Sequence, residues 1–406
     1  VRGNGLFLAL CVTLLLGGFV GVLMLNTAMA EGSYALVVAG RRAGTLVRLA
    51  RSGGGESNSL GSREPADTIP VIGTAAGTAM RTQTVQVEPL PDGDRVCVHA
   101  PVTERGEAVG VLELLLPYPP DDETMDYLAD AAHALAFVVI ADRRYTDLYE
   151  WCSRNARMTL EAEINRRLLP LSYTCEAGQF SLGGWLAPAT SAGGDAFDFA
   201  LDRDVLHVSI TDAMGHGVAA SLLATLGVGS LRNSRREGLP LAEHARQANA
   251  ALVEHARSDQ LMTGQMFRIE LATGRVEVVN AGHVLPLLVR RGATTEVELD
   301  ADAAFGVDPQ TAYRLQTFTL LPGDRLVLLT DGMLERKAAA ADVRGLLSQI
   351  GDLHPREAVQ VLTAAVVATS NENLEDDATT LVLDWYGGSD QTRDASSGAT
   401  VDRASS

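Results

Sequence analysis

The C-terminal half of this chain shows two hydrophobic periodicities, one typical of β-strands and the other of α-helices. From residue 179 onward, short runs of branched apolar residues end in acidic, glycine-containing turns, which is typical of β-strands. Strands are predicted at 180–186, 205–211, 267–271, 276–280, 326–330 and 379–384. Helices are predicted by their periodicity at 218–233, 239–257 and 355–369. Strands in clusters and helices in clusters favour a layered α+β domain over an alternating βαβ sheet.

The preceding segment, 32–140, predicts a smaller α/β domain. Residues 95–101 and 109–116 have the pattern of two strands around the turn at 104–107. The hairpin is followed by a helical pattern and by the run EINRRLLP at 163–170. This combination resembles the end of a GAF sensor domain that leads into a signalling linker.

Apolar residues recur at helical spacing from Met125 to Leu168, and no helix breaker occurs until Pro170. A single helix of this length would extend about 65–70 Å, too long to be buried in one small domain. We therefore expect a helical linker over 141–175, of a kind that also suits a homodimer. Two shorter helices with a joint at residues 142–144 fit the same pattern.

The stretch from Gly5 to Ala30 contains no charged side chain. About 20 apolar residues suffice to cross a bilayer, so residues 5–30 predict an N-terminal transmembrane anchor. Four arginines between 41 and 51 follow it and only Arg2 precedes it, which places the C-terminal bulk of a single-pass cell-membrane protein in the cytoplasm. A cleaved signal peptide, indicated by Ala28-Met29-Ala30, and a buried helix of the next domain are the alternatives.

Composition narrows the choice of function. The chain has 33 basic and 51 acidic side chains and a net charge of −18, so a dedicated nucleic-acid binder is not expected. Its four cysteines form no CxxC pair and its eight histidines no HExxH pair, which leaves carboxylates as the candidate metal ligands. Residues 387–406 are rich in Ser, Asp and Arg and predict a disordered tail.

Acidic residues at strand ends carry the candidate chemistry. They occur in Gly193-Gly194-Asp195 with Asp198 nearby, Asp212–Gly217, Thr330-Asp331-Gly332 and Asp376-Asp377. Aspartates that converge repel one another unless protons or cations neutralise them. Hard divalent cations with oxygen ligands suit such a cluster, and two of them can lower the pKa of a shared water and hold a phosphate for in-line attack. Phosphoester hydrolysis without a covalent intermediate is the chemistry that this pattern predicts.

Five motifs then occur in a familiar order, namely GGDAFD, DAMGHG, NAGH (280–283), LLTDGMLE (328–335) and DDATTLVL (376–383). Together they resemble the metal-dependent Ser/Thr phosphatases called PPM or PP2C, in the SpoIIE-type bacterial branch. The resemblance covers a domain at 176–386 and implies an αββα sandwich, in which helices flank two central antiparallel sheets. It also implies two ions, Mn²⁺ or Mg²⁺.

The resemblance assigns roles residue by residue. Asp212 should bridge both ions, with the carbonyl group of Ala213 as a further ligand. Asp331 and Asp376 should hold one ion, and Asp195 should reach the other directly or through water.

Four further residues are assigned less sharply. Asp198 and Asp377 are candidate metal ligands that could instead position other ligands. His216 is a candidate catalytic group or a turn residue, because DAMGHG is one residue longer than the eukaryotic DGHGG motif. His283 is expected to be structural.

The resemblance implies a membrane-anchored phosphatase that acts on a phosphorylated protein, with an anti-sigma-factor antagonist as the usual substrate of this branch, under control of the GAF-like region. No counterpart of the family's phosphate-binding arginine is found near the first acidic motif. A catalytically weak scaffold that binds a partner protein is therefore the alternative. Relation to the GGDEF synthases of cyclic dinucleotides fails, because Ala196 stands where a carboxylate is needed.

Overall fold

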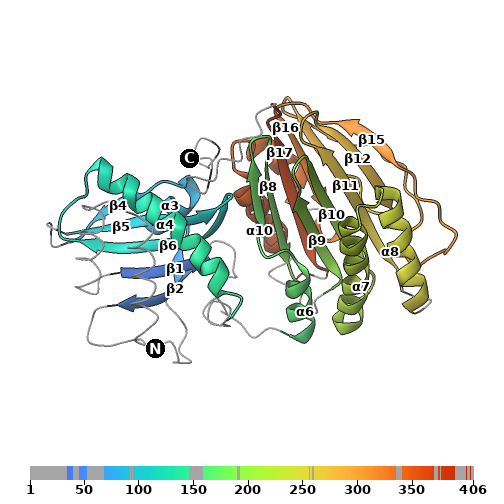
Figure 1. Cartoon of the computed structure of the whole chain (residues 1–406), viewed down its shortest axis with the longest axis horizontal. Coiled ribbons are helices and arrows are strands. Elements are labelled where there is room, and N and C mark those ends of the chain that lie inside the picture. Colours follow the sequence, from blue (N-terminus) through green and yellow to red (C-terminus); the bar gives the residue numbers. More distant parts are fainter. Residues whose placement is uncertain are drawn as a thin grey trace. The chain divides into compact units, whose positions relative to one another are not determined.

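The computed structural model describes residues 34–39, 45–52, 68–91, 93, 95–145, 159–189, 193–255, 257, 260–334, 341–369, 374, 376–388, 399 and 403. These residues belong to two compact units, one within 1–157 and 394–406 and the other within 158–393. Figure 1 shows the elements of both. The predicted membrane anchor at 5–30 and residues 389–398 of the predicted tail lie outside the described residues.

The first unit contains a six-stranded antiparallel sheet in the order β3-β2-β1-β6-β5-β4. Its strands are β1 (Tyr34–Ala39), β2 (Thr45–Ser52), β3 (Thr68–Pro70), β4 (Gln86–Pro89), β5 (Val96–Glu104) and β6 (Glu107–Leu116). The predicted hairpin joins β5 to β6 through Arg105 and Gly106, whose φ angles of 47° and 77° are the left-handed values that a tight hairpin turn needs. With α3 (Ala75–Thr82) and α4 (Asp122–Asp142), the unit is the α/β region that the sequence predicts.

The continuous helix predicted over 125–168 is wrong. α4 starts where the Asp121 side chain accepts from the backbone N–H of Thr124 at 3.0 Å, and residues 143–145 form a turn after its end. A new helix, α6 (Leu160–Leu168), begins at Thr159, whose backbone is extended. The alternative of two helices with a joint at 142–144 agrees with this break. Apolar residues can keep their helical spacing on both sides of such a joint, because this spacing reports only which side of each helix is buried.

Among the described helices, α4 alone is long and apolar enough to cross a bilayer by length and composition. One face of it, however, packs on β5 and β6 through buried residues such as Leu128, Leu135 and Val139. The core helix of a soluble domain has the same properties.

The second unit contains two antiparallel sheets with the strand orders β15-β12-β11-β10-β9 and β14-β13-β16-β17-β8-β7. The first sheet consists of β9 (Asp195–Leu201), β10 (Val205–Ala213), β11 (Met262–Glu270), β12 (Arg275–Ala281) and β15 (Gln316–Thr319). The second consists of β7 (Thr174–Ala177), β8 (Phe180–Ala187), β13 (Leu287–Arg290), β14 (Ala293–Glu296), β16 (Asp324–Leu329) and β17 (Ala378–Trp385). All six strands predicted in this unit are confirmed.

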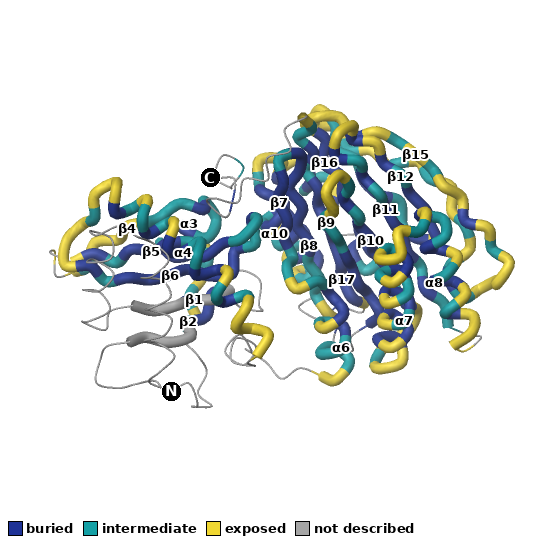
Figure 2. Tube along the Cα trace, viewed as in Figure 1, coloured by how far each residue is buried: buried dark blue, intermediate teal, exposed yellow. Residues whose placement is uncertain are grey.

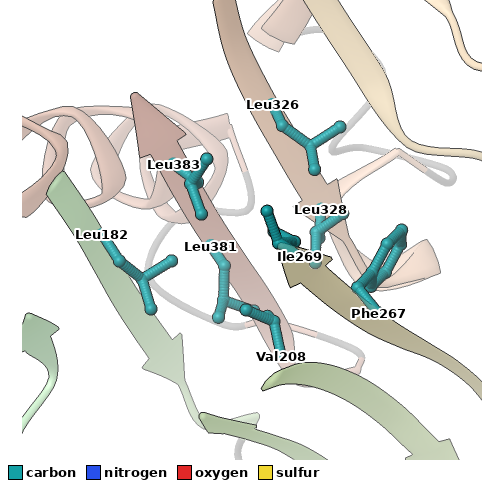
Figure 3. A pocket seen from close by; sticks show the side chains of 8 residues that line it. All are labelled: Leu182, Val208, Phe267, Ile269, Leu326, Leu328, Leu381 and Leu383. Atoms are coloured by element: carbon teal, nitrogen blue, oxygen red, sulfur yellow. The ribbon is translucent and has the colours of Figure 1, made fainter. Parts of the chain in front are cut away.

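The sheets pack face to face on a buried apolar core, dark blue in Figure 2. Figure 3 shows side chains of both sheets pointing into the space between them. They are Leu182, Val208, Phe267, Ile269, Leu326, Leu328, Leu381 and Leu383. Each such side chain contributes roughly 1.5–3 kcal/mol on burial, so this layer is a main source of the unit's stability.

Helices cover the outer face of each sheet. α7 (Gly217–Arg236) and α8 (Leu241–His255) pack on the first sheet, whereas α10 (Pro355–Thr369), with the short α9 (Val343–Gln349) beside it, packs on the second (Figure 1). α6 packs against α7. The predicted αββα arrangement of layers is therefore confirmed.

Candidate metal-dependent active site

Adjacent strands of the first sheet place two aspartates opposite each other. Asp212, near the end of β10, pairs with Asp195, the first residue of β9. Asp195 is only 1% exposed and Asp212 is half-buried. Side chains directly opposite in an antiparallel pair point to the same face with their Cβ atoms about 5 Å apart. Their carboxylates therefore share one place at the end of this sheet.

The second sheet brings two further aspartates to one of its ends. Asp331 follows β16 closely and Asp376 shortly precedes β17. Because these strands are antiparallel neighbours, the end of one adjoins the start of the other. The backbone N–H of Thr330 donates to the carbonyl oxygen of Thr379 at 3.1 Å. Asp331 and Asp376 consequently lie at the same end of the second sheet.

Hydrogen bonds between the sheets join these two ends. The hydroxyl groups of Thr330 and Thr379 both donate to Oδ2 of Asp195, at 2.7 and 2.6 Å. Asp195 thus contacts the strand ends that carry Asp331 and Asp376 while it faces Asp212 in its own sheet. The strand ends that carry four of the predicted ligands therefore lie at one edge of the sandwich.

Two glycines allow this approach. A Cβ atom at Gly193 would lie 3.1 Å from Oδ1 of Asp376 and 3.1 Å from Oδ2 of Asp377. A Cβ atom at Gly194 would lie 2.3 Å from the carbonyl oxygen of Ala213, the predicted backbone ligand. Any side chain at Gly194 would displace that carbonyl group, so the double glycine is a steric requirement of the site.

Asp377 holds the loop before β9. Its Oδ1 accepts from the backbone N–H of Ala189 at 2.7 Å, and its Oδ2 accepts from that of Gly193 at 2.9 Å. Burial raises the pKa of Asp377, while the two N–H donors oppose this shift. With both oxygens engaged by the backbone, Asp377 positions the Gly193 loop, which was the second of its two predicted roles.

Asp198 does not belong to the site, and its place among the candidate metal ligands is wrong. It is buried on the opposite face of β9 from Asp195, where it accepts from Arg232 at 2.7 Å and from Arg235 at 2.8 Å. The reason is the two-residue period of a strand, which sends residues three apart to opposite faces. Asp198 anchors α7 to the sheet.

The two histidines near the motifs differ in environment. His216 is exposed immediately before α7, and its side chain makes no capping hydrogen bond. Its catalytic role stays a prediction. His283 is buried, with ring nitrogens at 2.7 Å from Oγ1 of Thr263 and 3.1 Å from the carbonyl oxygen of Leu329, which agrees with the expected structural role.

The C-terminal part of the chain is similar to known proteins. Residues 202–386 match the family model described as Stage II sporulation protein E (SpoIIE). The phosphoserine phosphatase RsbU of Bacillus subtilis (strain 168) is 19% identical over 281 residues, which are 67% of this chain and 83% of RsbU. Residues 202–386 are a SpoIIE-family domain of the PPM phosphatases.

Solved structures of low identity are similar as well. The RsbU and RsbW domains of a Mycobacterium tuberculosis protein are 22% identical with a TM-score of 0.47, over 55% of this chain and 63% of that one. The PP2C domain of SpoIIE from Bacillus subtilis is 20% identical with a TM-score of 0.44, over 52% and 65%. The chain thus spans less than two thirds of either of these structures.

The phosphatase domain offers oxygen donors in the combination that hard divalent cations prefer. Burial, then the neighbouring carboxylates of Asp212 and Asp377, raise the pKa of Asp195 well above its usual value, and the threonine hydroxyls only partly oppose this. A cation among these carboxylates would remove the repulsion. Among the described residues, no group of three or more Asp, Glu, His or Cys side chains is already arranged so that it could hold a metal ion. The chemistry of the donors nevertheless fits Mg²⁺ or Mn²⁺.

Three residues of the phosphatase-domain site were missed by sequence reasoning. Thr330 and Thr379 stand inside quoted motifs, but only the approach of the two sheets gives their hydroxyl groups a common acceptor. Asn165 lies in α6, where its Nδ2 donates to the carbonyl oxygen of Gly193 at 2.6 Å. No local signal in the sequence indicates that contact.

Proposed function

We propose that the second unit is a metal-dependent phosphatase that hydrolyses phosphoserine or phosphothreonine in a protein substrate. The observation that carries this proposal is that the strand ends bearing Asp195 and Asp212 are hydrogen-bonded, through Asp195, to those that precede Asp331 and follow Asp376 in the other sheet. Four carboxylates at one sheet edge are costly without cations and well suited to binding two of them.

Mn²⁺ or Mg²⁺ would be held by the carboxylates of Asp195, Asp212, Asp331 and Asp376 and by the carbonyl group of Ala213. When bound, a pair of such ions supplies a water of lowered pKa and positive charge that stabilises the phosphoryl transition state. The chain itself keeps these oxygens in place, since strand ends have little freedom and Gly193 and Gly194 allow close approach of the backbone.

The loop after Ala213 serves the substrate in this proposal. Gly215 and Gly217 have φ angles of 102° and 75°, so the chain turns sharply from β10 into α7. The unpaired N–H groups at the start of a helix stabilise anions such as a phosphate. In this proposal His216, which is exposed at this turn, contacts the leaving oxygen of the substrate.

The substrate that we propose is a phosphorylated anti-sigma-factor antagonist, and the pathway is one that regulates a sigma factor. Support comes from the similarity to RsbU, whose name identifies it as a phosphoserine phosphatase. We further propose that the first unit is a GAF-like sensor, that residues 5–30 attach the protein to the cell membrane with the phosphatase domain in the cytoplasm, and that the segment between the units supports a homodimer.

The deciding experiment measures release of phosphate by the full chain from p-nitrophenyl phosphate and from a phosphoserine protein, with and without Mn²⁺. We expect hydrolysis that depends on Mn²⁺ and falls at least 100-fold in Asp212→Asn. Asp204→Asn removes an exposed carboxylate of the β9–β10 loop and is the matched control, with activity expected within twofold of wild type.

The absence of turnover above the Asp212→Asn background would overturn the enzymatic proposal. It would favour the scaffold alternative, for which the missing phosphate-binding arginine is the motivating observation. Binding of the same phosphoprotein without hydrolysis would then be the property to measure.

A further inference from the structure

Two buried hydroxyl groups converge on a single carboxylate oxygen in the phosphatase domain. Thr330 and Thr379 have no exposed surface, and their Oγ1 atoms lie 2.7 and 2.6 Å from Oδ2 of Asp195. When Asp195 is ionised to ligate a cation, hydrogen bonds to its charged oxygen are about twice as strong as those between neutral groups.

The direction of these hydrogen bonds is set by the backbone. The N–H of Thr379 donates to Oγ1 of Thr330 at 3.1 Å, which occupies a lone pair of that hydroxyl. The hydroxyl proton of Thr330 is therefore available for Asp195. The β16–β17 pairing thus orients a donor toward a residue of the other sheet.

The same hydroxyl groups connect the two halves of the candidate metal centre. Thr330 directly precedes Asp331, and Thr379 lies three residues after Asp376. Asp195 lies opposite Asp212 in the first sheet. Any change in the spacing of the sheets at this edge would stretch the hydrogen bonds at Asp195.

We propose that Thr330 and Thr379 are positioning residues of the metal centre. By holding Oδ2 of Asp195 they present Oδ1 as the oxygen that can ligate a cation, and they fix the separation between the carboxylates of the two sheets. The inference rests on the proposed function, because it takes these carboxylates to bind divalent cations. Mutation of residues that orient metal ligands in this way typically lowers metal affinity 10–100-fold.

The test compares Mn²⁺ binding to full-length variants by isothermal titration calorimetry. Thr330→Val and Thr379→Val keep the shape of the side chain and remove the hydroxyl, and each should weaken binding at least 10-fold. Thr380→Val is the matched control, because the hydroxyl of Thr380 is buried in β17 without a hydrogen-bond partner among the described residues. Its Mn²⁺ affinity should stay within twofold of wild type.

A second pair of variants guards against loss of folding, which circular dichroism monitors. Thr330→Ser and Thr330→Ala both lack the methyl group and differ only in the hydroxyl. Serine should restore the affinity to within about threefold of wild type, and alanine should not. In an Asp195→Ala background, Thr330→Val should have no further effect, because interacting residues are non-additive.

The outcomes separate this inference from the proposed function. Folded valine variants that bind Mn²⁺ as wild type does, or an equal loss in Thr380→Val, would overturn the positioning role while leaving the phosphatase proposal intact. A full additional loss from Thr330→Val in the Asp195→Ala background would also overturn it. Wild-type protein that binds no Mn²⁺ would instead contradict the proposed function itself.

Discussion

His283 donates from Nε2–H to the carbonyl oxygen of Leu329, 3.1 Å away, and thereby joins the first sheet to the strand that leads to Asp331. A carbonyl oxygen can only accept, so Nε2 carries the proton, and Nδ1 accepts from the hydroxyl of Thr263 at 2.7 Å. Burial favours the neutral ring, in which both nitrogens are engaged in this way. Burial lowers its pKa to about 4.

This state predicts a pH dependence of stability. Between pH 6.5 and 4 the unfolded chain protonates His283 and the folded chain does not, so the free energy of unfolding should fall as the pH falls. A pKa that moves from 6.5 to about 4 corresponds to about 3 kcal/mol. Urea unfolding of metal-free protein at pH 7 and 4.5 should show His283→Gln losing less stability than wild type.

Replacement of another histidine is the control for that measurement. His255 is exposed at the end of α8, and His255→Gln should keep the wild-type dependence on pH. An unchanged dependence in His283→Gln would contradict the assignment of a neutral buried ring.

The ion pairs of Asp198 predict that its replacement lowers the stability of the protein without affecting metal binding. Asp198→Asn leaves Arg232 and Arg235 without their carboxylate, and loss of one partner of a largely buried pair should cost about 1–3 kcal/mol. Mn²⁺ affinity should be unchanged, whereas Asp195→Asn should weaken it. Urea unfolding and calorimetric titration of the two variants check this; weaker Mn²⁺ binding in Asp198→Asn would return Asp198 to the metal centre.

Gly194 predicts a steric effect at the site. In Gly194→Ala the new Cβ atom would lie 2.3 Å from the carbonyl oxygen of Ala213, so we expect at least a 10-fold loss of Mn²⁺ affinity and of kcat. Gly229→Ala is the matched variant, since Gly229 lies in α7 with open space around its Cβ position. Thermal unfolding should show it to be stabilised by about 0.5–1 kcal/mol, with activity retained.

Removal of divalent cations should lower stability. A ligand that binds only the folded state at 100 times its Kd adds about 2.7 kcal/mol. Protein treated with EDTA should therefore unfold at a lower Tm, and excess Mn²⁺ should restore the wild-type value. Asp212→Asn should show little change in Tm on adding Mn²⁺; a full shift in that variant would show that the ion binds elsewhere.

The sequence predicted the strands that bear long branched apolar runs, such as β10 and β17, because both faces of these strands are buried. It did not predict β9, since Asp195–Leu201 carries an acidic residue toward each face and lacks a simple alternation. The error at Asp198 follows from that omission, because recognition of a strand would have sent it to the opposite face from Asp195.

The metal-site aspartates could be proposed from sequence because several motifs occur together in order. The threonine hydroxyls and the contact of Asn165 could not, because they depend on distances between segments that are remote in the chain. The sequence offered the break after α4 only as an alternative, a joint at 142–144, because apolar residues at helical spacing occur on both sides of it.

The hydrogen bond from Asn165 to the Gly193 carbonyl group makes α6 part of the phosphatase domain. A segment cut at residue 202, where the family match starts, would omit Asp195 and two strands of the second sheet. A segment that starts at residue 176 would still lack α6 and its hydrogen bond to the Gly193 loop. A catalytic segment intended for fusion to another protein therefore has to start at or before Thr159, whose side chain caps α6.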